Sequence, residues 1–78
     1  AYMAKPTYER ILNFARRAVK DEYDKPFQGG YYDNQSVLVA VANEFQDLDT
    51  DNDGDEELIR GAVRDAEQEF NDANGVEL

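Results

Sequence analysis

The sequence predicts an all-α fold, a compact three-helix bundle. Apolar residues recur at helical spacing over residues 7–23, 34–48 and 56–73, and each segment carries one apolar stripe that it cannot bury alone. Packing the three stripes together is the most economical solution. A chain of 78 residues forms one domain at most, so we expect a single small acidic helical domain over residues 1–78.

The first helix is expected over residues 7–23. Its apolar side chains gather on one half of a helical wheel, and only Glu22 intrudes there. Thr7 can act as the N-cap, because its hydroxyl accepts a hydrogen bond from an unpaired N–H of the first turn. Pro6, just outside the helix, helps to stop it from extending backwards.

The second helix, expected over residues 34–48, is ambiguous in its middle. The run VLVAVA, residues 37–42, also suits a buried strand. We favour a helix because the apolar residues recur at helical spacing and the following NEFQDL is compatible with a helix.

The third helix, expected over residues 56–73, has the clearest amphipathic pattern, with only Glu69 on the wrong side. Glu56 and Glu57 suit the positive end of the helix dipole. Asn74 and Gly75 supply the left-handed stop that is expected where the helix ends.

Composition excludes most catalytic chemistry. The chain has no Cys and no His, which removes disulfides, imidazole or thiolate metal sites and nucleophiles activated by histidine. Its formal net charge of -10 repels nucleic acid and anionic membranes. We therefore expect neither an enzyme nor a protein that binds nucleic acid directly.

The chain shows no membrane or targeting segment. Its longest apolar run, residues 37–42, is far shorter than a bilayer-spanning helix. Met3 followed by AKPTYERIL resembles a natural start. We therefore expect Ala1 and Tyr2 to be a vector remnant and the protein to be cytoplasmic.

An acidic loop joins the second and third helices. The stretch DLDTDNDGDEEL places carboxylates at Asp49, Asp51 and Asp53, ahead of Gly54. Alternate carboxylates in a tight turn converge on one hard cation, and a glycine allows the sharp turn that brings a later carbonyl inward. The carboxylates of residues 47–57 repel one another, which favours cation uptake.

This helix-loop-helix stretch resembles the calcium loop of EF-hand proteins. The resemblance implies one calcium ion held by Asp49, Asp51, Asp53, Asp55 through its carbonyl, and Glu57. It departs from the family where Arg60 replaces a bidentate glutamate and Glu56 replaces an apolar residue. What remains is a shortened loop, in which the third helix begins early and Glu56 or Glu57 completes the coordination shell.

The alternative for this loop is a solvated acidic connection without a metal. Aspartate is frequent in the whole chain, and it favours turns and helix caps on its own account. In that case Asp53 or Asp55 caps the third helix, and Gly54 gives the turn its conformational freedom.

Charge is divided unevenly along the chain. Residues 1–20 carry five basic and one acidic residue, whereas residues 21–78 carry three basic and 17 acidic residues. The basic face of the first helix either contacts an acidic neighbour or is an ordinary solvated face partly paired with nearby acids, and we favour the second. That face comprises Arg10, Arg16, Arg17 and Lys20.

The acidic remainder suits a basic protein partner. Carboxylates such as Glu56, Glu67 and Asp72 can imitate rows of phosphates and occupy a nucleic-acid-binding groove on another protein. Small acidic immunity proteins and phage-encoded inhibitors have a similar composition. On this interpretation the outer carboxylates Glu67 and Asp72 are exposed. Solubility in a high-salt cytoplasm is the other interpretation.

The connection YDKPFQGGYY, residues 23–32, is rich in aromatic residues. If exposed, Phe27, Tyr31 and Tyr32 form a binding surface of large amphipathic side chains. If folded back, they close the end of a thin core. We favour closure, because small domains need that buried area.

These observations predict a non-catalytic, acidic, helical protein-binding module whose 49–57 loop holds one calcium ion. The alternative is an acidic inhibitor, a nucleic-acid mimic that blocks a basic nucleic-acid-binding protein. No motif in the sequence points to a biological process, a particular partner or an oligomeric state.

Overall fold

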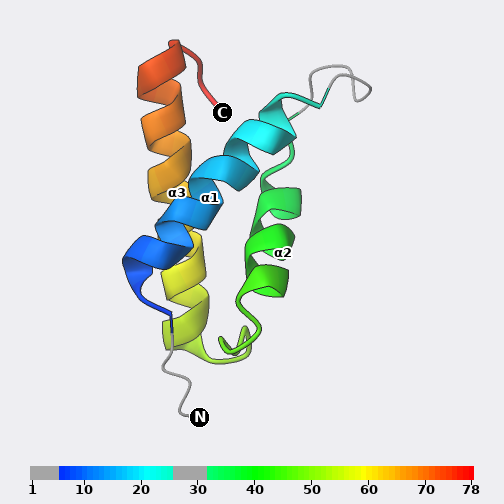
Figure 1. Cartoon of the computed structure of the whole chain (residues 1–78), viewed down its shortest axis with the longest axis vertical. Helices are drawn as coiled ribbons and strands as arrows, with labels where there is room; N and C mark the ends of the chain where they lie inside the picture. The colour runs from blue at the N-terminus through cyan, green and yellow to red at the C-terminus, as the bar shows by residue number, and fades with distance from the viewer. Residues whose placement is uncertain (1–5, 26–31) are drawn as a thin grey trace.

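The predicted three-helix bundle is confirmed by a computed structural model, which describes residues 6–25 and 32–78 (Figure 1). Helix α1 spans Tyr8–Tyr23, α2 spans Asn34–Glu44 and α3 spans Asp53–Asn74. Helix α1 crosses α3 obliquely, and α2 packs against both of them. The described residues contain no strand, and none of their helices has the length and apolar character needed to cross a bilayer.

Two of the predicted helix ends are confirmed. The Thr7 hydroxyl accepts a hydrogen bond from the N–H of Arg10 at 3.3 Å, so Thr7 is the N-cap of α1. At the other end of the chain Gly75 adopts the left-handed conformation, with φ of 66°, and its N–H donates to the carbonyl of Asn71 at 2.8 Å. A glycine is favoured there because residues that carry a side chain rarely adopt a positive φ.

Helix α2 is shorter than predicted. The segment 37–42 is helical, as favoured, but α2 ends at Glu44 instead of residue 48. A turn follows, in which the N–H of Leu48 donates to the carbonyl of Phe45 at 3.0 Å. Both Phe45 and Leu48 are buried, because a turn closed between residues three apart keeps the two side chains on one side, much as a helix does. The apolar spacing therefore persisted beyond the helix end.

Helix α3 begins earlier than predicted, at Asp53 instead of residue 56. Its N-cap is Asn52, whose Oδ1 accepts hydrogen bonds from the N–H groups of Gly54 at 2.9 Å and Asp55 at 3.2 Å. The expectation that Asp53 or Asp55 caps this helix is therefore wrong. Gly54 supplies no left-handed turn either, since Gly75 is the one described glycine with a positive φ. A Cβ on Gly54 would lie 3.2 Å from Asn52 Oδ1, so glycine permits the close approach of the cap.

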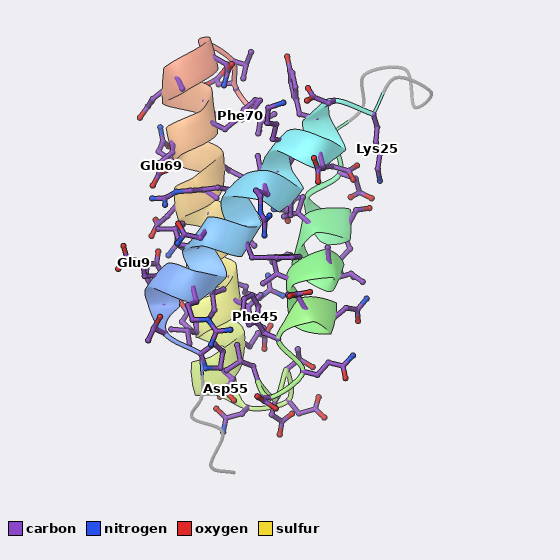
Figure 2. All side chains as sticks on the ribbon, in the orientation of Figure 1. Glu9, Lys25, Phe45, Asp55, Glu69 and Phe70 are labelled. Atoms are coloured by element: carbon purple, nitrogen blue, oxygen red, sulfur yellow. The ribbon has the colours of Figure 1, made fainter. Side chains whose placement is uncertain are left out.

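The core lies between the three helices and is built mainly from small and branched apolar side chains, with one aromatic ring. It consists of Ile11, Ala15, Val19, Val37, Val41, Phe45, Leu48, Ile59, Ala62, Val63 and Ala66. Phe45 points inward from the turn after α2 (Figure 2) and meets Phe14 of α1 edge to face, with ring centroids 5.7 Å apart. The 45–48 turn therefore closes the end of the bundle nearest the acidic loop.

Glu22, which interrupts the apolar stripe of α1 in the sequence, is buried in the structure with 5% of its surface exposed. Its Oε1 accepts a hydrogen bond from Lys25 Nζ at 2.8 Å. Pairing with a cation offsets part of the cost of burying a carboxylate.

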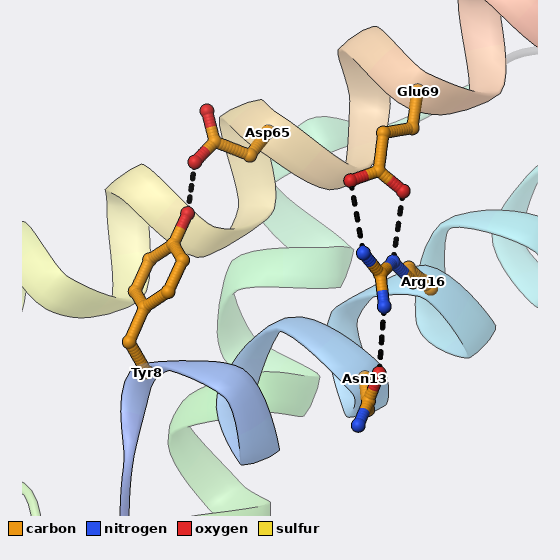
Figure 3. A network of polar contacts seen from close by, with 5 residues as sticks. All are labelled: Tyr8, Asn13, Arg16, Asp65 and Glu69. Atoms are coloured by element: carbon orange, nitrogen blue, oxygen red, sulfur yellow. Dashed lines mark hydrogen bonds and ion pairs between the residues drawn. The ribbon is translucent and has the colours of Figure 1, made fainter.

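Polar contacts join the outer parts of α1 and α3 at the surface, beside the core that the two helices share (Figure 3). Arg16 donates two hydrogen bonds to the carboxylate of Glu69, at 2.8 and 3.0 Å, and Tyr8 donates one to Asp65. The arrangement explains why Glu69 lies on the wrong side of the α3 pattern. Lys20 pairs with Asp24 at 2.8 Å, so the basic face of α1 is partly paired with nearby acids, as favoured.

Candidate binding groove and acidic loop

The acidic loop between α2 and α3 is held by hydrogen bonds between its own side chains and backbone. Asp49 Oδ1 accepts from the N–H of Asp51 at 2.9 Å, which forms a local Asx-type turn. From the first turn of α3, Asp55 Oδ2 reaches back to the N–H of Asp49 at 3.0 Å. Asp55 retains only 9% of its surface exposed, and it lies at the loop end of the bundle (Figure 2).

The predicted calcium ligands are not gathered into a coordination shell. Within residues 6–25 and 32–78, no three acidic side chains form a group that could hold a metal ion. Asp51, Asp53 and Glu57 are exposed, and the side chain that reaches back is that of Asp55, whereas Glu56 pairs with Arg60 at 2.7 Å. Calcium at Asp49–Glu57 stays a prediction, and binding would require these side chains to rearrange.

Tyr32, a predicted partner-binding residue, lies half-buried against the core. Its hydroxyl donates to Glu67 Oε2 at 2.6 Å, and Asn34 Nδ2 donates to the same oxygen at 2.7 Å. Burial and the hydrogen bond to Glu67 both raise the pKa of Tyr32 above its ordinary value. The side chain therefore closes the bundle, as favoured. Phe27 and Tyr31 lie outside the described residues.

The expectation that Glu67 is exposed is wrong, because its bonds with Tyr32 and Asn34 hold it half-buried. Asp72 is exposed as expected, and it accepts a hydrogen bond from Gln68 at 3.1 Å. Many carboxylates of α3 thus have partners within the molecule. Those with a described partner are Asp55, Glu56, Asp65, Glu67, Glu69 and Asp72.

A groove of about 370 Å³ lies between α2 and α3. Its apolar lining comes from Leu38, Val39, Ala42 and Ile59. Thr50 lines it where the acidic loop begins, and Glu56 and Arg60 stand beside it on α3. Val39 keeps 47% of its surface exposed, which is high for a valine because aliphatic side chains are usually buried.

The sequence interpretation did not identify this groove, although α2 contains a signal for it. The run VLVAVA is apolar on every side of a helix, and a helix that is apolar all round is typical of burial on more than one face. In the bundle α2 buries Val37 and Val41 in the core and leaves Leu38, Val39 and Ala42 along the groove. The same run that suited a strand therefore marks a helix with a second apolar face.

Comparison of the chain with protein-family models, with curated proteins and with solved structures gives no match.

Proposed function

We propose that this protein is a non-catalytic, acidic protein-binding module and that the groove between α2 and α3 is its binding site. The observation that carries the proposal is the half-exposed Val39 on a helix whose groove side is apolar. Covering such surface on association is favourable by roughly 25 cal/mol for each Å² of apolar area. A protein partner is the natural source of apolar side chains that fill a groove between two helices.

The chemistry of the groove supports a binding role over a catalytic one. Its lining is mainly aliphatic and amide, and the two charged groups beside it, Glu56 and Arg60, neutralise each other at 2.7 Å. Catalysis needs convergent polar groups with separated pKa values, whereas recognition of a partner needs an apolar patch with a polar rim. The groove has the second arrangement.

The test is affinity capture with a matched pair of variants. Val39→Ser removes the exposed apolar side chain from the groove, and valine and serine have similar helix propensities, so the fold should persist. Leu78→Ser removes another exposed apolar side chain, at the end of the chain. We expect wild type and Leu78→Ser to retain the same partner and Val39→Ser to lose it. Equal retention by both variants, with unchanged unfolding curves, would show that the groove is not the site.

The inhibitor alternative makes a different prediction for the same capture experiment. A phosphate mimic recruits basic nucleic-acid-binding proteins through long-range attraction, so its binding falls steeply with salt and free DNA or RNA competes with it. Capture of that kind, unaffected by Val39→Ser, would favour the mimic over the groove. Many α3 carboxylates already bond within the molecule, which leaves fewer of them to imitate phosphates and weighs against the mimic.

Calcium binding in the 49–57 loop is a separate proposal. It is supported by the alternation of Asp49, Asp51 and Asp53 and by the helix-loop-helix setting. An ion bound there would lie beside the loop end of the groove, because Thr50 and Glu56 belong to both the loop and the groove lining.

A further inference from the structure

We propose that the occupant of the α2–α3 groove is a basic amphipathic helix of a partner protein, which lies between these helices as a fourth helix of the bundle. The inference rests on the proposed binding function of the groove and adds to it the chemistry of the partner. Three features of the described structure lead to it: the charge around the groove, the ion pair beside it, and its two helical walls.

The stretch of chain that forms α2 and the loop beside the groove is acidic in sequence, although the described groove lining itself contains one acidic residue, Glu56, and one basic residue, Arg60. Between Lys25 and Arg60 the sequence contains no basic residue and nine acidic residues. This stretch includes the whole of α2 and the loop that ends the groove at Thr50. The neighbours of Thr50 in the loop include the exposed side chains of Asp51 and Asp53. Because opposite charges steer and orient a partner, the groove favours apolar residues flanked by Lys or Arg.

The ion pair beside the groove offers a carboxylate to such a partner. Arg60 Nε donates to Glu56 Oε1 at 2.7 Å, and the two side chains keep 58% and 41% of their surface exposed. Exposed pairs of this kind contribute little stability, so an incoming cation can replace Arg60 at Glu56. Arg60 is also the one basic residue among the described groove-lining residues. It therefore competes with a basic partner.

The walls of the groove favour a helical occupant. Two helices that run side by side leave a trough that a third helix can fill, as in four-helix bundles and in peptide recognition by helical grooves. The described residues present no strand edge to which an extended peptide could add. The volume of about 370 Å³ lies toward the lower end of the range for binding sites, so one short apolar stripe is enough to fill the groove.

The experiment uses three synthetic peptides of equal length with the full chain. The first has a leucine stripe at helical spacing and lysines elsewhere, the second has glutamates in place of the lysines, and the third is the first with its order scrambled. Calorimetry gives the affinities, and backbone amide shifts of the protein give the site. We expect the first peptide to bind at least about tenfold more tightly than the others and to shift the amides of Val39, Ala42 and Ile59.

Two charge variants of α3 sharpen the test. Arg60→Gln and Arg64→Gln change the net charge equally, but only Arg60 lines the groove among the described residues. We expect Arg60→Gln to tighten binding of the first peptide several-fold and Arg64→Gln to have a smaller effect, because Arg60 competes for Glu56. Equal effects of the two variants would mean that overall charge, and not this ion pair, attracts the peptide, which would overturn the inference.

The remaining outcomes separate this inference from the proposed function. If the glutamate peptide binds in the groove as tightly as the lysine peptide, the groove binds helices but the basic partner is wrong. If no peptide shifts the groove amides while Val39→Ser still abolishes capture of a partner, the binding function stands and the helical occupant is wrong. If sedimentation shows a dimer that Val39→Ser dissociates, the occupant is a second copy of this chain, and the inference falls.

Discussion

Asp55, in the first turn of α3, accepts a hydrogen bond from the backbone N–H of Asp49 through Oδ2 at 3.0 Å. The bond joins the start of α3 to the chain that leaves α2, and Asp55 is nearly buried where it forms. Thr50, directly after Asp49, lines the groove between the same two helices. The contact therefore fixes the loop end of the groove as well as the start of the helix.

Asp55→Ala should destabilise the fold. It removes the carboxylate acceptor of the part-buried hydrogen bond with the N–H of Asp49, a loss of about 1.5–3 kcal/mol in the free energy of unfolding. Asp53→Ala is the matched control, because Asp53 is exposed in the same helical turn, and its loss should cost about 0.3–1 kcal/mol through the helix dipole. Urea unfolding of both variants measures the difference. Equal destabilisation would mean that the Asp55–Asp49 bond adds nothing beyond helix-terminal charge.

The stability that Tyr32 contributes to the fold should be lost at alkaline pH. The pKa of Tyr32 is raised in the folded state, first by burial and then by the hydrogen bond to Glu67. The unfolded chain therefore releases the tyrosine proton first, and the stability from this site, present below the ordinary pKa of 10.0, falls as the pH rises above it.

Tyr32→Phe tests this directly. At neutral pH the variant should lose about 1 kcal/mol of unfolding free energy, because it removes the hydroxyl that donates a hydrogen bond to Glu67. Above about pH 10 its stability should fall less steeply than that of wild type. Parallel curves for the two proteins across the alkaline range would show that Tyr32 does not cause the loss.

The sequence predicted the helices well and their ends less well, for reasons visible at particular residues. Amphipathic spacing placed the cores of α1 and α3 correctly, because burial of one face dominates those segments. It extended α2 to Leu48, since the turn at Phe45–Leu48 keeps the same apolar spacing. The amphipathic spacing placed the start of α3 three residues late, because the N-cap is the side-chain amide of Asn52. Asn52 stands among several aspartates that are equally good N-cap residues, so the sequence alone does not single it out.

Contacts between distant segments were beyond reach of the pattern. The misplaced Glu69 was visible as an exception, but its partner Arg16 depends on the packing of α1 against α3. The intruding Glu22 was visible too, and its partner Lys25 lies only three residues along the chain. Glu67 was expected to be exposed because the wheel of α3 alone ignores Tyr32 and Asn34. Predicting the groove requires the relative position of α2 and α3, and a helical wheel of one helix does not contain that information.

The Arg16–Glu69 pair should contribute stability that is lost in acid. The two hydrogen bonds from Arg16 lower the pKa of Glu69 below its ordinary value of 4.5. The contribution is therefore fully present above that value and disappears as the pH falls through the lower pKa of the folded state. Glu69→Gln should flatten the acid limb of a plot of unfolding free energy against pH. Glu77→Gln, at an exposed site near the end of the chain, should leave that limb unchanged, and an equal effect of both would assign the acid loss to overall charge.

The proposed calcium ion predicts a selective rise in the melting temperature. A ligand that binds only the folded state adds about 2.7 kcal/mol to the free energy of unfolding when its free concentration is about a hundred times its dissociation constant. In a domain of this size that gain raises the melting temperature by at least about 10 °C. Calcium should give this rise, and magnesium at equal ionic strength should give a smaller one.

The double variant Asp49→Asn with Asp51→Asn should abolish the calcium response without unfolding the loop. Asparagine at residue 49 keeps a side-chain oxygen that can accept a hydrogen bond from the N–H of residue 51, and the N–H of residue 49 can still donate to Asp55. The variant therefore removes two charges from the proposed shell while the described loop hydrogen bonds persist. Calorimetric titration of wild type and variant gives the binding directly. An equal rise with magnesium or sodium, or a calcium response that survives in the double variant, would mean that cations only screen the acidic loop.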